Sequence, residues 1–191
     1  ANAEADAERT RNGWFWSGDL GYRDAEGFFY FAGRTSDWLR VDGENFAAGP
    51  VERILARFPG VVTAVVYPVP DPRTGDQAMA VLELSDPGAF DPAAFARFLE
   101  EQPDLGTKWA PRFVRVTGAV PLTASGKVDK RPLRRALWNT ADPVWWRPFA
   151  TRAARGTGTG PVLRYQRMVP EDADTLAAEF SAHGRRDLLE A

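Results

Sequence analysis

The sequence predicts an α+β fold in which a small β-hairpin leads into a three-stranded sheet packed with helices, followed by an irregular and helical C-terminal extension. Three observations support this prediction. Short aromatic runs separated by turn residues fill the first part of the chain, and β-branched or alternating runs follow at 61–69, 78–84 and 111–117. Amphipathic segments with helix-starting residues lie between these runs, which is the pattern of a compact α+β unit.

The hairpin region comes first. The first dozen residues are polar and alanine-rich, and we expect a frayed lead-in or a short helix there. Asp24 to Gly27 carries a turn signal, and the aromatic run Phe28 to Phe31 predicts a strand. Trp38 to Val41 predicts another strand, which ends at the tight-turn dipeptide Asp42-Gly43.

Helices are predicted around the three longer strands. Pro50 suits a first helical position, and the segment VERILARF after it has apolar residues at helical spacing. Asp91 suits an N-cap and Pro92 a first helical position, which predicts a second helix. The basic segment VDKRPLRRAL predicts a short third one.

The tail of the chain has a different pattern. Residues 142–160 run through prolines and Gly-Thr repeats without periodicity, so we expect a loop on the surface. The last segment predicts one or two helices that begin near Asp172 or Asp174, with Leu176 and Phe180 as apolar contacts.

Composition excludes several classes of function. The chain has no cysteine, and its only histidine is His183, which argues against thiolate catalysis, a His-based triad or a multi-His metal site within the chain. The formal net charge of −2 gives no general attraction to nucleic acid. No apolar run approaches the ~18–20 residues of a membrane span, and no signal-peptide pattern is present. We therefore expect a cytoplasmic protein with no metal site and no nucleic-acid partner.

The segment PLTASGK, residues 121–127, places Gly126 before a single lysine. It is not a P-loop, because Pro121 stands where the first glycine of that motif belongs and Val128 follows the lysine in place of Ser or Thr. A turn that presents one lysine remains, and by itself this is more typical of a solvated loop.

Two further segments carry candidate polar residues. Asp19 lies in SGDLG, where a carboxylate can accept two hydroxyl hydrogen bonds, as ribose recognition requires. An Asx-turn or a helix cap is the alternative, and it is the commoner one. Arg34 lies in GRTSD, and its alternative is a surface ion pair with an acidic neighbour.

The order of the segments is more specific than any one of them. Four motifs follow one another along the chain: W-x-G-D-L, then D-x-x-G-x-x-x-x-x-G-R-x-x-D, then G-E-N followed by V-E, and finally P-L-T-x-x-G-K before a basic helix. In this order they resemble the C-terminal portion of adenylate-forming enzymes, over about residues 13–137. This superfamily includes acyl-CoA synthetases, the adenylation domains of peptide synthetases, and luciferases. The stretch from Asp24 to Glu52 is most similar in style to long- and very-long-chain fatty acid–CoA ligases of the fatty-acid-transport-protein type.

The resemblance implies a two-step ligation. A carboxylic acid attacks ATP to give acyl-AMP and pyrophosphate, and a thiol, usually CoA, then displaces AMP. Asp19 would bind the ribose hydroxyls, Arg34 would assist at the ribose and phosphate side, and Lys127 would contact the substrate carboxylate and the α-phosphate as the catalytic cation. ATP and Mg²⁺ would be bound mainly by a large N-terminal domain, so Lys127 needs no phosphate-binding loop of its own.

The resemblance also implies a rotation of the small domain between the two steps. The hinge would be Ser36, where relatives often have Asp or Lys, with Asp37 as the near alternative. Gly43, Glu44 and Asn45 would then line the CoA channel, since a glycine lets the backbone approach the pantetheine arm closely. Asn45 replaces an Arg found in some relatives, which weakens the expectation of a charged contact to CoA there.

These implications divide the chain into three parts. Residues 1–34 would be the end of the large N-terminal adenylation domain and the approach to the hinge, 35–140 the mobile C-terminal domain, and 141–191 a C-terminal extension. We expect a fragment that is inactive alone, with its own N-terminal domain, a fatty acid, ATP and CoA as partners. Peripheral membrane association of the full-length enzyme is compatible with this function.

Three alternatives stay open at this point. The chain is also compatible with a fatty acyl-AMP ligase that loads a carrier protein, and with a steroid or bile-acid CoA ligase. The third alternative is a non-catalytic protein-interaction module in which Trp14, Trp16 and the pair Trp145-Trp146 form the binding surface. The basic stretch KVDKRPLRR would either guide CoA phosphates or stay solvated.

Overall fold

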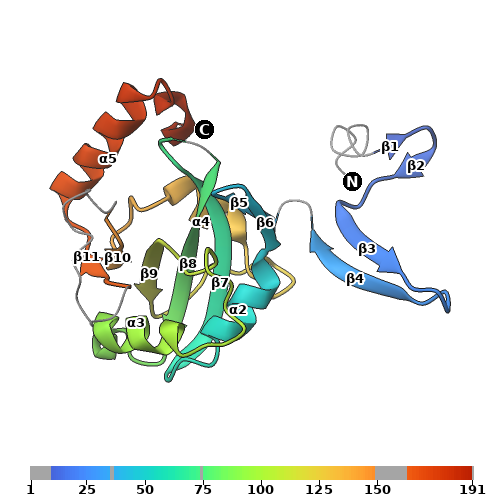
Figure 1. The fold of residues 1–191 in the computed structure, drawn as a ribbon, viewed down its shortest axis with the longest axis horizontal. Helices are drawn as coiled ribbons and strands as arrows, with labels where there is room; N and C mark the ends of the chain where they lie inside the picture. Colours follow the sequence, from blue (N-terminus) through green and yellow to red (C-terminus); the bar gives the residue numbers. More distant parts are fainter. Residues whose placement is uncertain (1–9, 35–36, 74, 149–162, 191) are drawn as a thin grey trace.

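The computed structural model of the chain describes residues 10–34, 37–73, 75–148 and 163–190. Figure 1 shows a body built on a twisted sheet, with helices around it, and a hairpin that stands out from this body near the N-terminus. The largest sheet has five strands in the order β11-β10-β9-β8-β7. Three two-stranded sheets, β1-β2, β3-β4 and β5-β6, precede it in the sequence.

The N-terminal strands form hairpins, as the aromatic runs predict. β1 (Thr10–Arg11) pairs with β2 (Trp14–Phe15), and β3 (Asp19–Arg23) pairs with β4 (Phe29–Arg34). The predicted turn at 24–27 is confirmed, since the Gly27 N–H donates to the Asp24 carbonyl at 3.2 Å. Two expectations need correction. Thr10–Arg11 is a strand and not part of a helix, and Asp19 opens strand β3 instead of sitting in a turn.

The three predicted strands form the centre of the five-stranded sheet. They are β7 (Val61–Pro70), β8 (Asp76–Leu84) and β9 (Phe113–Thr117). β8 and β9 run parallel, while β7 pairs with β8 in antiparallel fashion. The parallel pair requires a crossover, and the crossover carries the helix α3 (Pro92–Glu100).

The sheet is larger than the sequence predicts. β10 (Val144–Trp146) pairs with β9, and β11 (Gln166–Arg167) pairs with β10. The expectation of an irregular loop was therefore wrong for residues 144–146. A three-residue strand between prolines has too little length to show a period of two, so its pairing depends on the exposed edge of β9.

The predicted helical segments are confirmed, and the predicted start is matched at α3. α3 begins with Asp91, whose side chain accepts hydrogen bonds from the N–H groups of Ala93 and Ala94. α4 (Lys130–Ala136) begins after Asp129, which caps it in the same way. α2 (Ala48–Leu55) starts two residues before Pro50. α5 (Pro170–Ala182) and the short 3₁₀ helices η2 (Pro87–Ala89) and η4 (Arg186–Leu189) complete the fold.

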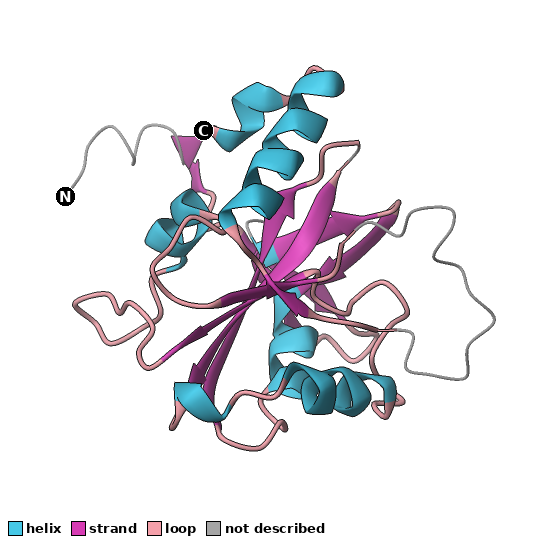
Figure 2. Cartoon of the chain, turned by 90° about the vertical axis from the view of Figure 1, so that its left-hand side faces the viewer, coloured by secondary structure: helices cyan, strands magenta, loops and turns pink. Residues whose placement is uncertain are grey.

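Helices cover both faces of the large sheet, as Figure 2 shows. Because side chains alternate along a strand, each face has its own apolar core. One core joins the sheet to α2, α3 and the hairpin of β5 (Trp38–Val41) and β6 (Glu44–Ala47). The other joins it to α4 and α5, with Leu133, Leu176 and Phe180 almost fully buried.

The C-terminal segment is built into both cores. Trp146 is 4% exposed, and its indole N–H donates to the Asp172 carboxylate at 3.2 Å. Trp145 is half-buried and packs near Phe90, with ring centroids 5.8 Å apart. These two tryptophans therefore do not form the exposed binding surface considered above, whereas Trp14 is 77% exposed. None of the described helices is long and apolar enough to cross a membrane.

Candidate functional site

Lys127 lies on a short, closed loop that leads into α4. Leu122 and Val128 form an antiparallel bridge at its base, and the Thr123 N–H donates to the Lys127 carbonyl at 2.7 Å. The Lys127 N–H donates in turn to the Thr123 hydroxyl at 3.2 Å. Gly126 has φ = 76°, a left-handed conformation that favours glycine and accounts for the Gly before the lysine. The backbone of the loop is therefore well defined.

The Lys127 side chain, in contrast, has no ion-pair partner among the described residues. It is exposed, and within the described parts of the chain no carboxylate lies within ion-pair distance of its ammonium group. An exposed cation on an ordered loop can meet an anion that another domain or a ligand supplies.

Asp19 and Arg34, which the sequence suggested separately, form one pair. They face each other across β3 and β4, and the Arg34 Nε donates to the Asp19 Oδ1 at 2.8 Å. Their side chains remain 40% and 59% exposed, respectively. The ion pair that was the alternative explanation for Arg34 thus exists, and its partner is the other candidate. The two groups can act together on a ligand with hydroxyl and anionic groups.

The two hinge candidates have different outcomes. Ser36 lies outside the described residues. Asp37 directly precedes β5, and its Oδ1 accepts a hydrogen bond from an Arg134 terminal nitrogen at 3.0 Å and lies 3.6 Å from the Lys130 Nζ.

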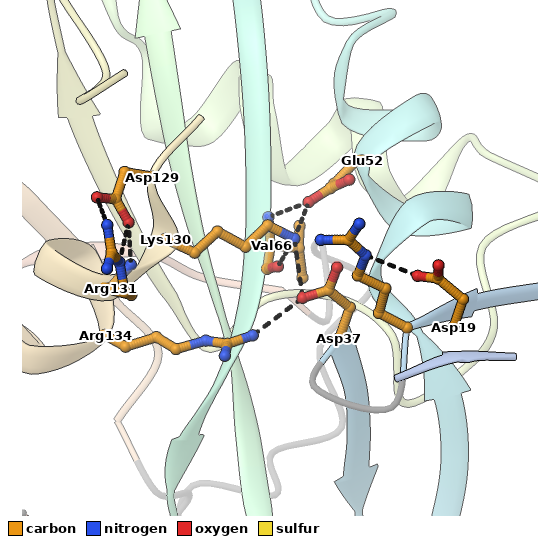
Figure 3. A network of polar contacts seen from close by, with 9 residues as sticks. Asp19, Asp37, Glu52, Val66, Asp129, Lys130, Arg131 and Arg134 are labelled. Atoms are coloured by element: carbon orange, nitrogen blue, oxygen red, sulfur yellow. Dashed lines mark hydrogen bonds and ion pairs between the residues drawn. The ribbon is translucent and has the colours of Figure 1, made fainter. Parts of the chain in front are cut away.

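Asp37 belongs to a network that Figure 3 shows from close by. The Lys130 Nζ donates to the Glu52 Oε1 at 2.9 Å and to the Val66 carbonyl at 3.1 Å. The Glu52 Oε1 also accepts the Val66 N–H at 2.9 Å. The network therefore joins α4 to α2, to β7 and to the residue that begins the β5–β6 hairpin.

Sequence analysis missed the roles of Lys130 and Arg134. It treated the basic stretch as a single surface that either contacts CoA phosphates or stays solvated. Lys130 and Arg134 are four residues apart, so they share one face of α4, and this face points to Asp37. Arg131 and Arg135 are on the exposed side. The four-residue spacing of Lys130 and Arg134 was the feature of the sequence that could have indicated this shared face.

The predicted CoA-channel residues lie on the turn between β5 and β6. Asp42 and Gly43 have φ of 47° and 83°, as a type I′ hairpin turn requires. A Cβ placed on Gly43 would meet no atom within 4 Å, so this backbone is open to an approaching ligand. Asn45 is exposed beside it.

Two residues that the sequence did not single out support this turn. The Trp109 indole N–H donates to the Glu44 Oε1 at 2.8 Å, and the Lys108 ammonium donates to the Asp42 carbonyl at 2.7 Å. The Trp109 ring also stacks on Phe46 with centroids 5.3 Å apart. Glu44 is thus held in place by a neighbour, and its carboxylate is partly shielded. Among the described residues, no group of three or more His, Cys, Asp or Glu side chains could hold a metal ion.

Comparison with known proteins places these features in a family. The profile of the AMP-binding enzyme C-terminal domain matches residues 50–127. The chain is 53% identical over 188 residues to the steroid-22-oyl-CoA synthetase of Rhodococcus jostii, covering 98% of this chain and 32% of that protein. It is 52% identical over 141 residues to a medium/long-chain-fatty-acid–CoA ligase of Mycobacterium tuberculosis, covering 74% of this chain and 28% of that protein.

Solved structures agree with this. ATP-bound MatB from Rhodopseudomonas palustris superposes with a TM-score of 0.59 at 30% identity, over 71% of this chain and 27% of that one. The o-succinylbenzoate CoA synthetase of Bacillus subtilis, in complex with its acyl-adenylate intermediate, gives 0.59 at 31% identity, over 74% of this chain and 28% of that one. The chain therefore spans about a third or less of the length of these relatives. The resemblance seen in the sequence motifs is confirmed: residues 50–127 match the AMP-binding enzyme C-terminal domain family, and acyl-CoA synthetases are among the relatives of the chain.

Proposed function

We propose that the chain is the C-terminal part of an AMP-forming acid–thiol ligase that activates a carboxylic acid with ATP and transfers the acyl group to CoA. The observation that carries this proposal is the exposed Lys127, which has no carboxylate partner in the described part of the chain and lies on an ordered loop at the end of the region that matches the family profile. Relatives that share more than half of their aligned residues with this chain are named as CoA ligases or synthetases, which supports the same reaction here.

In the first step, Lys127 acts on charge that develops outside its own domain. An ammonium group that has no carboxylate partner loses no existing ion pair when it enters a site that excludes water. There it stabilises the negative charge on the substrate carboxylate and on the α-phosphate oxygens. The ATP and its Mg²⁺ are bound mainly by the large domain of the full enzyme.

Asp19 and Arg34 serve the nucleotide in the same step. The Asp19 carboxylate accepts hydrogen bonds from the ribose hydroxyls, and Arg34 holds this carboxylate in orientation through the 2.8 Å contact. Because the Arg34 side chain is more than half exposed, its remaining N–H groups can also face the phosphate side of the nucleotide.

In the second step, the domain turns about the hinge region at Ser36 and presents the turn between β5 and β6. The open backbone at Gly43 lines the pantetheine arm of CoA, with Glu44 and Asn45 beside it. Trp109 fixes Glu44, so the wall of the channel keeps its shape when the domain arrives.

The acid substrate is a large apolar carboxylic acid. The alignment with the steroid-22-oyl-CoA synthetase extends through the C-terminal segment of this chain, whereas the alignment with the medium/long-chain-fatty-acid–CoA ligase covers 74% of it. A steroid with a carboxylated side chain is therefore the first acid to test, and a long-chain fatty acid is the second.

The test uses the enzyme that carries this chain together with its large domain. It is incubated with ATP, Mg²⁺, each acid, and either CoA or a carrier protein with a pantetheine arm, and AMP and thioester are quantified. We expect acid-dependent AMP release that matches acyl-CoA formation, and no turnover by the isolated chain. Turnover by the isolated chain, or no AMP release with any acid, would contradict the proposal. Thioester formed only on the carrier protein would reassign the acceptor.

A further inference from the structure

We propose that Lys130 and Arg134 are positioning residues that fix Asp37 to helix α4, so that Asp37 and the loop carrying Lys127 turn as one rigid body. The pivot of the domain then lies before Asp37. This inference rests on the proposed function, because it concerns how the domain carries Lys127 to the nucleotide.

The first step of the argument is the contact made by Asp37. Two cations of one helix approach a single carboxylate oxygen, Arg134 at 3.0 Å and Lys130 at 3.6 Å. The three side chains are at most about a third exposed, so solvent screens this attraction less than at an open surface. A residue whose side chain is held by the domain in this way turns with that domain. Asp37 is therefore a poor pivot between this domain and another.

Lys130 connects this contact to the core. The Lys130 ammonium donates hydrogen bonds to Glu52 at 2.9 Å and to the Val66 carbonyl at 3.1 Å, and it forms an ion pair with Asp37 at 3.6 Å. Glu52 lies on α2 and Val66 on β7, and both elements belong to the packed body of the domain. Figure 3 shows Lys130 extending from α4 toward all three.

The last step leads from α4 to Lys127. Asp129 caps α4, and its own N–H donates to the Pro121 carbonyl at 2.8 Å. Together with the bridge between Leu122 and Val128, this bond ties both ends of the Lys127 loop to the start of the helix. A shift of α4 relative to Asp37 is therefore passed directly to the position of Lys127.

The test is a double-mutant cycle in the enzyme that contains the large domain, with acid-dependent pyrophosphate release as the readout. A misplaced catalytic group lowers the rate strongly, so we expect Arg134→Met to lower kcat about 10-fold with KM for ATP unchanged. In a Lys127→Ala background the same substitution is expected to have almost no effect, since the position of the missing group no longer matters.

The controls use the same helix. Arg135→Met removes an equal charge from the exposed side of α4 and is expected to change kcat by less than about twofold. Arg134→Lys keeps the charge and is expected to recover most of the lost rate. If Arg134→Met does not fold, Asp37→Asn replaces it, with the same expected pattern. An equal fold-loss in both backgrounds, or no loss at all, would overturn the inference. A Lys127→Ala enzyme that still adenylates normally would instead contradict the proposed function.

Discussion

Lys127 and Lys130 are three residues apart, and their surroundings are opposite. Lys127 is exposed on a loop and has no carboxylate partner within the described residues. Lys130 is 20% exposed, donates hydrogen bonds to Glu52 and to the Val66 carbonyl, and forms an ion pair with Asp37. In the proposed function, this difference has a use: Lys130 holds the support of the loop in place, and Lys127 is left for a ligand bound by another domain.

The two lysines are expected to differ most in how much each contributes to the stability of the fold. Lys130→Met removes one partner from a half-buried network and leaves Glu52 and Asp37 less compensated, so the free energy of unfolding should fall by about 2–3 kcal/mol. Lys127→Met should change it by less than about 0.5 kcal/mol, since nothing in the fold depends on its charge. Urea unfolding of the purified chain, followed by tryptophan fluorescence, measures both. Equal effects of the two substitutions would show that the surroundings of the two lysines do not decide their contribution to stability.

A smaller loss is expected at the turn between β5 and β6, for which a role in the second step is proposed. Trp109→Phe keeps an aromatic ring against Phe46 but removes the N–H that binds Glu44. Because this hydrogen bond is to a charged group, unfolding should become easier by about 1.5–2 kcal/mol. Glu44→Gln is the matched variant, as it retains the acceptor and loses only the charge. If Trp109→Phe leaves the urea midpoint unchanged, the turn is not held by this contact.

Much of the contrast between the two lysines could not be predicted from the sequence. The sequence indicates the strands β7, β8 and β9, the cap Asp91 and the turn at Asp42-Gly43, because each depends on residues that are close together in the chain. The partners of Lys130 are 78 and 64 residues away in the sequence, so only the packing of α4 against α2 and β7 brings them together.

The strand in the C-terminal segment also depends on contacts with residues that are distant in the sequence. Val144–Trp146 is too short to show a strand pattern, and its two tryptophans resemble a contact surface as much as a core. Its place is set by the edge of β9 and by α5, whose Asp172 accepts the Trp146 N–H. Lys108 and Trp109 were likewise missed, since neither lies in a motif that points to the turn they support.

Tyr165 is a buried ionisable group that the fold favours in its uncharged form. Burial raises the pKa of the Tyr165 hydroxyl to about 12, although the positive charge of Arg147 acts to lower it. This hydroxyl donates to the Pro111 carbonyl at 2.5 Å. A folded-state pKa above the ordinary value of 10 means that the stabilisation is complete below pH 10 and is lost as the pH rises toward 12.

Two measurements check this expectation. Tyr165→Phe should lower the free energy of unfolding by about 1 kcal/mol at pH 8, the typical net value of one hydrogen bond. Between pH 10 and 12 the variant should lose less stability than the parent, because it has no hydroxyl to ionise at this position. Parallel pH curves for the two proteins would show that Tyr165 does not contribute in this way.

The smallest effect is expected for an ion pair at the open surface. Arg57 contacts Asp104 at 2.7 Å, but both side chains are 49% exposed. The hydrogen bond from Arg57 lowers the pKa of Asp104, so any stabilisation is present at neutral pH and is lost as the pH falls into the acid range. Because water and salt screen such a pair, Arg57→Ala should leave the urea midpoint at pH 7 unchanged within error. A loss comparable to that of Lys130→Met would mean that burial does not decide the value of these pairs.

The proposed function requires that Lys127 acts on the nucleotide step and on no other. The direct measurement is Lys127→Ala in the enzyme that contains the large domain, with the two half-reactions assayed separately. We expect acid-dependent pyrophosphate release to fall by about 10²–10³-fold, the range for removal of one preorganised group that stabilises developing charge. Transfer of the acyl group from supplied acyl-adenylate to CoA should be nearly unchanged. Equal losses in both half-reactions, or an unchanged rate of pyrophosphate release, would contradict the proposed role of Lys127.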